Sequence, residues 1–152
     1  MPNELSAKVV FQEKVRFTGQ ARSEPPVVID YLPPLGDGAG LMPLELLLLS
    51  LAGCSGQTVI GLLRMMEQPV QGLEVKACGQ RRDEHPTIFT SIGLEFVVHG
   101  ADIDPALVSR AIALSEERYS PIWDMLKVGT TITSSFRLIE GNPINSKEFV
   151  FF

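Results

Sequence analysis

The sequence has few of the residues on which several specialised protein classes depend. Its 152 residues include only two cysteines, two histidines and one tryptophan. Cys54 and Cys78 are too few for a disulfide framework, and together with His85 and His99 they lack the spacing of a zinc site. We therefore expect no metal and no cofactor, and any cysteine chemistry should be that of a single thiol.

Positive charge is also scarce. Thirteen Lys and Arg stand against eighteen Asp and Glu, which gives a net charge of −5. No basic cluster is longer than Arg81-Arg82, so a surface that neutralises a nucleic-acid backbone is not expected. The N-terminus, Met1-Pro2-Asn3-Glu4, has no basic stretch followed by an apolar run, as a secretory signal would. We expect a cytoplasmic protein that does not bind nucleic acid.

One segment has the length of a membrane span, because residues 46–63 contain no charge. Four polar residues and three glycines dilute its hydrophobicity, and Glu45 and Arg64 bracket it. A helix that is apolar on nearly every side is buried either in lipid or in the middle of a protein. We interpret this segment as a core helix and expect no membrane association.

The spacing of apolar residues predicts an α+β fold. Alternation at period two predicts strands over 6–17, 73–80 and 89–99, the last two forming a hairpin, and runs rich in β-branched residues predict strands over 27–31 and 130–138. Helical spacing and capping residues predict helices over 42–66, 105–118 and 122–126. The order shows no repeat and no alternating βαβ rhythm, which is typical of an α+β domain. We expect one domain over residues 1–152.

The long helix predicts a second subunit. A helix that is apolar all round needs cover on both sides, and one small sheet covers only one. Ala52, Gly53 and Gly56 would let another backbone approach closely. A partner subunit would supply the missing cover.

Residue patterns alone give each candidate an ordinary structural interpretation. Cys54 fits an inert core thiol, since free cysteine is among the most buried residue types. Ser120 fits a helix N-cap, Glu45 a surface carboxylate near a helix N-terminus, and Arg22 a turn residue. His85 and His99 have no paired carboxylate spacing that would indicate a base.

Two ordered motifs carry a family resemblance. The string Pro43-Leu44-Glu45-Leu46-Leu47 with Gly53-Cys54 resembles the helix of the OsmC/Ohr family, the osmotically induced and organic hydroperoxide resistance proteins. Glu117-Arg118-Tyr119-Ser120-Pro121-Ile122 resembles the family motif E-x-Y-C-P-V, with serine where the family has cysteine. The resemblance covers about residues 8–139, which leaves 140–152 as a C-terminal extension ending in Phe149-Val150-Phe151-Phe152.

The resemblance implies a fold and a chemistry. The fold is an intertwined homodimer, with antiparallel sheets wrapped around the long central helices. The chemistry is that of a thiol peroxidase in which Cys54, as thiolate, attacks an organic hydroperoxide. The family uses an N-terminal arginine, held by a glutamate near the start of the long helix, to favour the thiolate. Arg22 is the best match for this arginine, and Arg16 is the second choice. Glu45 is the candidate for the glutamate. It lies nine residues before Cys54, whereas the peroxidases have this acid ten residues before their reactive cysteine.

Ser120 is the larger departure, because a serine hydroxyl does not form the disulfide that the family's second cysteine forms. Three interpretations remain: a one-cysteine peroxidase with an external thiol reductant, a peroxidase that uses Cys78 instead, and a non-catalytic dimer that binds an apolar small molecule or senses redox state. The working hypothesis is the first.

Overall fold

The computed structural model describes residues 3–141, so residues 142–152 of the expected extension lie outside the described part. The chain divides into two compact units, one up to Leu47 and one from Leu48 onward, and each is described by itself. The expectation of a single domain over the whole chain stays a prediction.

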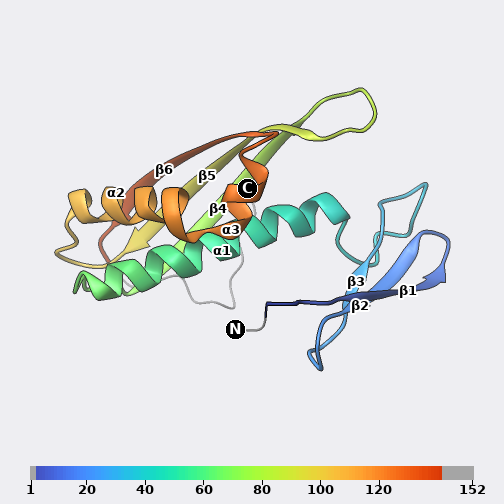
Figure 1. Cartoon of the computed structure of the whole chain (residues 1–152), viewed down its shortest axis with the longest axis horizontal. Helices are drawn as coiled ribbons and strands as arrows, with labels where there is room; N and C mark the ends of the chain where they lie inside the picture. Colours follow the sequence, from blue (N-terminus) through green and yellow to red (C-terminus); the bar gives the residue numbers. More distant parts are fainter. Residues whose placement is uncertain (1–2, 142–152) are drawn as a thin grey trace. The chain divides into compact units, whose positions relative to one another are not determined.

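The first unit contains an antiparallel sheet in the order β1-β2-β3 (Figure 1). Its strands are β1 (Lys8–Glu13), β2 (Arg16–Gln20) and β3 (Val27–Ile29). The prediction of one strand over 6–17 is wrong, because a tight turn at Lys14 separates two paired strands. Lys14 has a φ of 50°. The apolar residues occupy odd-numbered positions both before and after the turn, so the sequence pattern did not reveal the turn.

Apolar side chains of this unit are unusually exposed. The exposed set on the strands and the following loop is Val9, Val10, Phe11, Val27, Val28, Tyr31, Leu32, Leu35 and Leu41. Phe11, for example, is 56% exposed although its ring contacts Phe17 edge to face. A set of exposed apolar residues of this size is typical of a surface that another chain covers.

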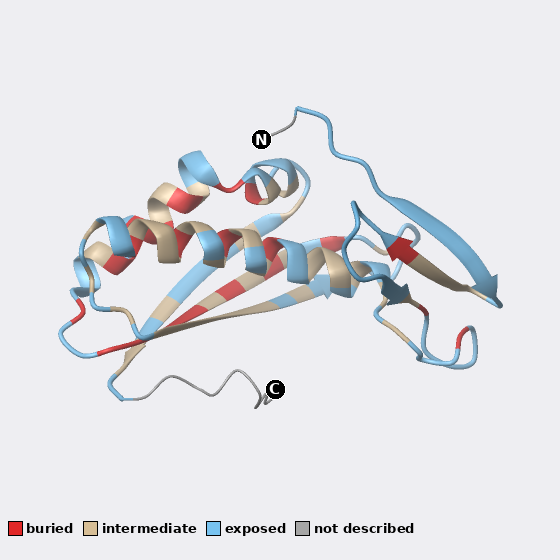
Figure 2. Cartoon of the chain, turned by 90° about the horizontal axis from the view of Figure 1, so that it is seen from below, coloured by how far each residue is buried: buried red, intermediate tan, exposed pale blue. Residues whose placement is uncertain are grey.

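The long helix α1 spans Pro43–Met65, close to its predicted bounds, with proline in its first turn. It buries one narrow stripe, made of Leu51, Ser55, Val59 and Leu63, while its other faces are half-buried or exposed (Figure 2). Among the described residues it is the one helix long and apolar enough to cross a membrane. Because its buried stripe packs within the second unit, we interpret it as a core helix.

The second unit contains a sheet in the order β4-β5-β6, covered on one side by helices (Figures 1 and 2). The strands are β4 (Gly72–Arg81), β5 (Phe89–His99) and β6 (Thr131–Ile139). The predicted hairpin of β4 and β5 is confirmed, whereas β6 runs parallel to β5 because helices connect the two. The α+β class is therefore confirmed, with one parallel pair in place of the expected all-antiparallel sheets.

The connection between β5 and β6 contains three helical segments. Asp104 caps α2 (Pro105–Leu114) by accepting from the N–H of Ala106, as the sequence predicts. The predicted helix over 105–118 ends earlier, because Ser115–Tyr119 forms the π-helix η1. The short helix α3 (Pro121–Leu126) then begins at Ser120.

Candidate active site

Cys54 lies on α1 beside the buried stripe and is half-buried. Its neighbour Ser55 belongs to that stripe and is 1% exposed. The hydroxyl of Thr58, one turn later, donates to the carbonyl of Cys54 at 2.9 Å. The thiol therefore stands at the border between the packed face of the helix and its open face.

Ser120, which precedes α3, lies close to Cys54. The Ser120 Oγ lies 3.3 Å from the Cys54 Sγ, and it is assigned as the donor. The two residues are 66 positions apart in the sequence, and Ser120 is only 3% exposed. The fold thus brings together the two motif positions that the sequence singled out.

The local structure around Ser120 explains its position. Its N–H donates to the carbonyl of Ser115 at 2.9 Å, which closes the π-helical turn η1. Its Oγ accepts from the N–H of Trp123, so the predicted N-cap role is confirmed. A π-helical turn is a rare local structure that is frequent at functional sites.

Cys78 points away from this site. Residues of a strand alternate between the two faces of the sheet, so Cys78 shares a face with Glu74 and Lys76, whereas Val75 faces the helices. Val75 is the near neighbour of Gly56 on α1, since a methyl group on Gly56 would lie 3.1 Å from Val75 Cγ2. Cys78 is exposed on the opposite face and is therefore badly placed to reach Cys54 within one chain.

Arg22 and Glu45 belong to the first unit, where both have local contacts. Arg22 has a φ of 57° and a side chain that is 78% exposed, with Glu24 at 3.8 Å. Glu45 accepts from the N–H of Met42 at 2.8 Å and so caps the start of α1. The interpretation of Glu45 as an N-terminal helix carboxylate fits this contact.

Arg16 is held by three carboxylates. Its guanidinium lies 3.0 Å from Asp37, 3.1 Å from Glu13 and 3.5 Å from Asp30. Asp30 is 1% exposed, and the backbone N–H groups of Ala39, Asp37 and Tyr31, with Arg16, hold its pKa below the usual range. Sequence reasoning missed this cluster because the prolines and glycines of residues 30–39 indicated only a connecting loop.

His99 has a carboxylate partner that sequence spacing did not indicate. Its Nε2 lies 3.0 Å from Glu74 Oε2, and its side chain is 4% exposed. The register pairs Gly72 with His99, so Glu74 and His99 are diagonal neighbours on the face that carries Cys78. The pair is therefore separate from the Cys54 site.

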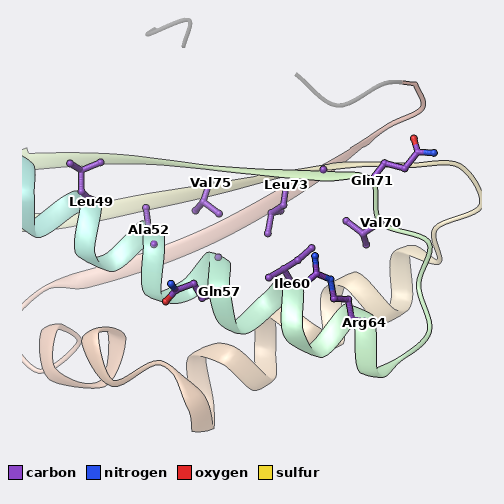
Figure 3. A pocket seen from close by; sticks show the side chains of 12 residues that line it. Leu49, Ala52, Gln57, Ile60, Arg64, Val70, Gln71, Leu73 and Val75 are labelled. Atoms are coloured by element: carbon purple, nitrogen blue, oxygen red, sulfur yellow. The ribbon is translucent and has the colours of Figure 1, made fainter. Parts of the chain in front are cut away.

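A groove runs between α1 and β4 (Figure 3). Its volume is about 510 Å³, and it is open to solvent. The lining is mainly apolar, with Arg64 and two glutamines as polar members; it consists of Leu49, Ala52, Gly53, Gly56, Gln57, Ile60, Arg64, Val70, Gln71, Gly72, Leu73 and Val75. Cys54 is not part of this lining. Within residues 3–141, no group of three or more His, Cys, Asp or Glu is arranged to hold a metal ion.

Comparison with known proteins places these features in a family. The model of the OsmC-like protein family matches residues 36–135. Protein YhfA of Escherichia coli strain K12 is 36% identical over 135 residues, which cover 89% of this chain and 98% of that protein. The chain belongs to the OsmC-like family.

Solved structures share the OsmC-like fold. An OsmC-like protein from Mycoplasma pneumoniae matches with a TM-score of 0.79 at 19% identity, covering 91% of this chain and 99% of that chain. The organic hydroperoxide resistance protein OhrB of Bacillus subtilis matches with a TM-score of 0.61 at 13% identity, covering 88% and 98%. These likenesses establish the OsmC-like architecture, and the family match spans both Cys54 and Ser120.

Proposed function

We propose that this OsmC-like protein is a thiol-dependent peroxidase that reduces organic hydroperoxides through Cys54. The observation that carries the proposal is the 3.3 Å contact between Cys54 Sγ and Ser120 Oγ. It supports a site at these two motif positions, with a thiol at the border of the packed core.

The reaction has two stages. The Cys54 thiolate attacks the terminal oxygen of the hydroperoxide, the O–O bond breaks, and protonation of the products gives a sulfenic acid and an alcohol. A first molecule of external thiol then attacks the sulfenic sulfur, releases water and forms a mixed disulfide. A second thiol reduces that bond, which regenerates Cys54 and yields the oxidised reductant.

The reductant is proposed to come from outside the chain. The hydroxyl of Ser120 does not form a disulfide, and Cys78 lies on the opposite face of its sheet from the helices. Cys54 as a residue is half-buried rather than fully buried, which favours reaction with a small thiol. These observations support a one-cysteine cycle.

We assign the thiolate-stabilising cation to Arg22. Arg16 is engaged by three carboxylates, whereas Arg22 has one ion-pair contact, at 3.8 Å, and is 78% exposed. Glu45 is the acid that the family resemblance assigns to holding this arginine. Its present contact with the Met42 N–H leaves its second carboxylate oxygen for a guanidinium.

The protein is proposed to work as a homodimer in the cytoplasm. Exposed apolar residues in the first unit and the open apolar groove beside α1 are the surfaces that a second copy would cover. A methyl group on Gly53 would meet nothing within 4 Å, so the helix surface there is free for close approach. Light scattering should give about twice the chain mass of 16.7 kDa.

Steady-state turnover tests the function. With dithiothreitol as reductant, the wild-type protein should consume an organic hydroperoxide such as cumene hydroperoxide faster than hydrogen peroxide. Cys54→Ala should lower consumption by about 100-fold or more, because no other group supplies the nucleophile. Cys78→Ala is the matched control and should keep the wild-type rate. Unchanged consumption in Cys54→Ala would make the mechanism wrong.

The open apolar groove favours one alternative, a non-catalytic dimer that binds an apolar small molecule. Its volume lies in the range of small-molecule sites. A stoichiometric apolar compound found by native mass spectrometry, with a Cys54 that does not react with hydroperoxide, would favour this alternative over the peroxidase.

A further inference from the structure

The geometry leaves the Ser120 hydroxyl one proton to donate. A hydroxyl carries one donor and two acceptor positions. Its oxygen already accepts from the N–H of Trp123 at 3.3 Å. Its proton is directed at Cys54 Sγ, also at 3.3 Å, which lies within the range for a hydrogen bond to sulfur.

The backbone fixes the position of this hydroxyl. The N–H of Ser120 donates to Ser115, and its carbonyl accepts from the N–H of Asp124 at 3.1 Å. With 3% of the residue exposed, water competes little for the Oγ. A hydrogen bond in such a setting is electrostatically stronger than in water.

We propose that Ser120 is a catalytic residue that stabilises the Cys54 thiolate by hydrogen-bond donation. The inference rests on the proposed peroxidase function and adds a role for the residue at the second motif position. A hydrogen bond to an ionised sulfur is stronger than one to a neutral thiol, so the donor favours the reactive form. Serine thus activates the sulfur without resolving its oxidised form.

The experiment follows alkylation of Cys54 by iodoacetamide as a function of pH, in a Cys78→Ala background that leaves one thiol. Ser120→Ala should shift the profile to higher pH by about one unit and slow alkylation at pH 7 roughly tenfold, the size of a charge-assisted hydrogen bond. Ser120→Thr keeps the hydroxyl and should restore the profile. Ser135→Ala, on an exposed position of β6, is the matched serine control and should leave the profile unchanged.

Loss of the helix cap needs its own control. Ser120→Ala removes the acceptor for the Trp123 N–H as well as the donor, so α3 loses its cap. Glycine is a tolerated N-cap residue that lacks the hydroxyl. Ser120→Gly should therefore shift the alkylation profile as Ser120→Ala does, and it keeps the test available if the alanine variant fails to fold. An unchanged profile in the folded variants would overturn the proposal.

A gain-of-chemistry variant tests the same contact. Ser120→Cys, treated with one equivalent of cumene hydroperoxide, should form an intramolecular disulfide, which peptide mapping detects as a cross-link to Cys54. A variant that forms only a dimedone-trapped sulfenic acid at Cys54 would contradict the close contact.

The two proposals fail separately. If wild-type Cys54 does not react with hydroperoxide but removal of the hydroxyl still shifts the alkylation profile, the peroxidase function is wrong and the role of Ser120 towards the sulfur is supported. If the wild type reduces hydroperoxide and removal of the hydroxyl leaves the alkylation profile unchanged, the role of Ser120 is wrong and the peroxidase function is supported.

Discussion

The two cysteines have contrasting surroundings within the same unit. Cys54 is half-buried on a helix with the Ser120 hydroxyl at 3.3 Å, whereas Cys78 is exposed on the opposite face of the β4-β5-β6 sheet. In the register, Cys78 pairs with Gly93, which offers no side chain to donate to its sulfur. The comparison teaches that exposure and a positioned donor are separate properties: the more exposed thiol pairs with a glycine, whereas the half-buried thiol has a hydroxyl 3.3 Å from its sulfur.

The largest expected effect concerns Arg22, the cation that we propose to stabilise the Cys54 thiolate. Arg22→Met should lower hydroperoxide consumption by about 100-fold, as removal of a charge-stabilising group does in other enzymes. Arg81→Met, three residues after Cys78 on β4, is the matched control and should leave the rate within about twofold of wild type. Stopped-flow measurement of hydroperoxide loss checks both variants. Equal rates in the two variants would break the assignment of Arg22.

The next effect concerns the packing beside each cysteine. Gly56→Val places side-chain atoms against Val75. The first added carbon would lie only 3.1 Å from Val75 Cγ2. Because this contact is too close, the free energy of unfolding should fall by about 1–3 kcal/mol. At Gly93, opposite Cys78, the first added carbon would lie 3.9 Å from Thr133 Oγ1, which is an ordinary contact. Gly93→Val should therefore keep the free energy of unfolding or raise it by up to about 1 kcal/mol, because glycine weakens the interior of a strand. Urea unfolding measures both. A larger loss at Gly93 would reverse the comparison between the two faces.

Several features of the comparison could be predicted from the sequence. The bounds of α1, the β4-β5 hairpin and the Ser120 cap followed from periodicity and capping residues, because these signals are local. Family motifs identified Ser120 as the counterpart of a second cysteine.

Other features could not be predicted because they depend on contacts distant in sequence. The turn at Lys14 lies between two apolar runs that both occupy odd-numbered positions, so one bulged strand and a hairpin have nearly the same pattern. The Asp30 carboxylate accepts hydrogen bonds from backbone N–H groups within residues 31–39 and from the side chain of Arg16. No local sequence motif predicts these contacts. The contact of His99 with Glu74 depends on strand register, which spacing alone does not give.

The smallest expected effect on activity concerns Asp30. Its folded-state pKa is lowered, chiefly by the Ala39 N–H, so its carboxylate stabilises the fold above the unfolded value of about 4 and this contribution is lost as the pH falls further. Asp30→Asn should lower the thermal midpoint at pH 7 and weaken its acid dependence, with hydroperoxide consumption within about twofold of wild type. Calorimetry from about pH 3 to about pH 7 checks the first outcome, since this range spans that value. A large loss of turnover with an unchanged thermal midpoint would contradict this prediction and would mean that Asp30 and its contacts take part in the reaction of the thiol.

The most direct test compares both thiols in one sample. Reduced protein is mixed with one equivalent of cumene hydroperoxide in the presence of dimedone, and peptides containing Cys54 and Cys78 are quantified by mass spectrometry. The account predicts rapid dimedone labelling at Cys54 and little at Cys78, although Cys78 is the more exposed thiol. Labelling that follows exposure, with Cys78 modified and Cys54 untouched, would contradict it.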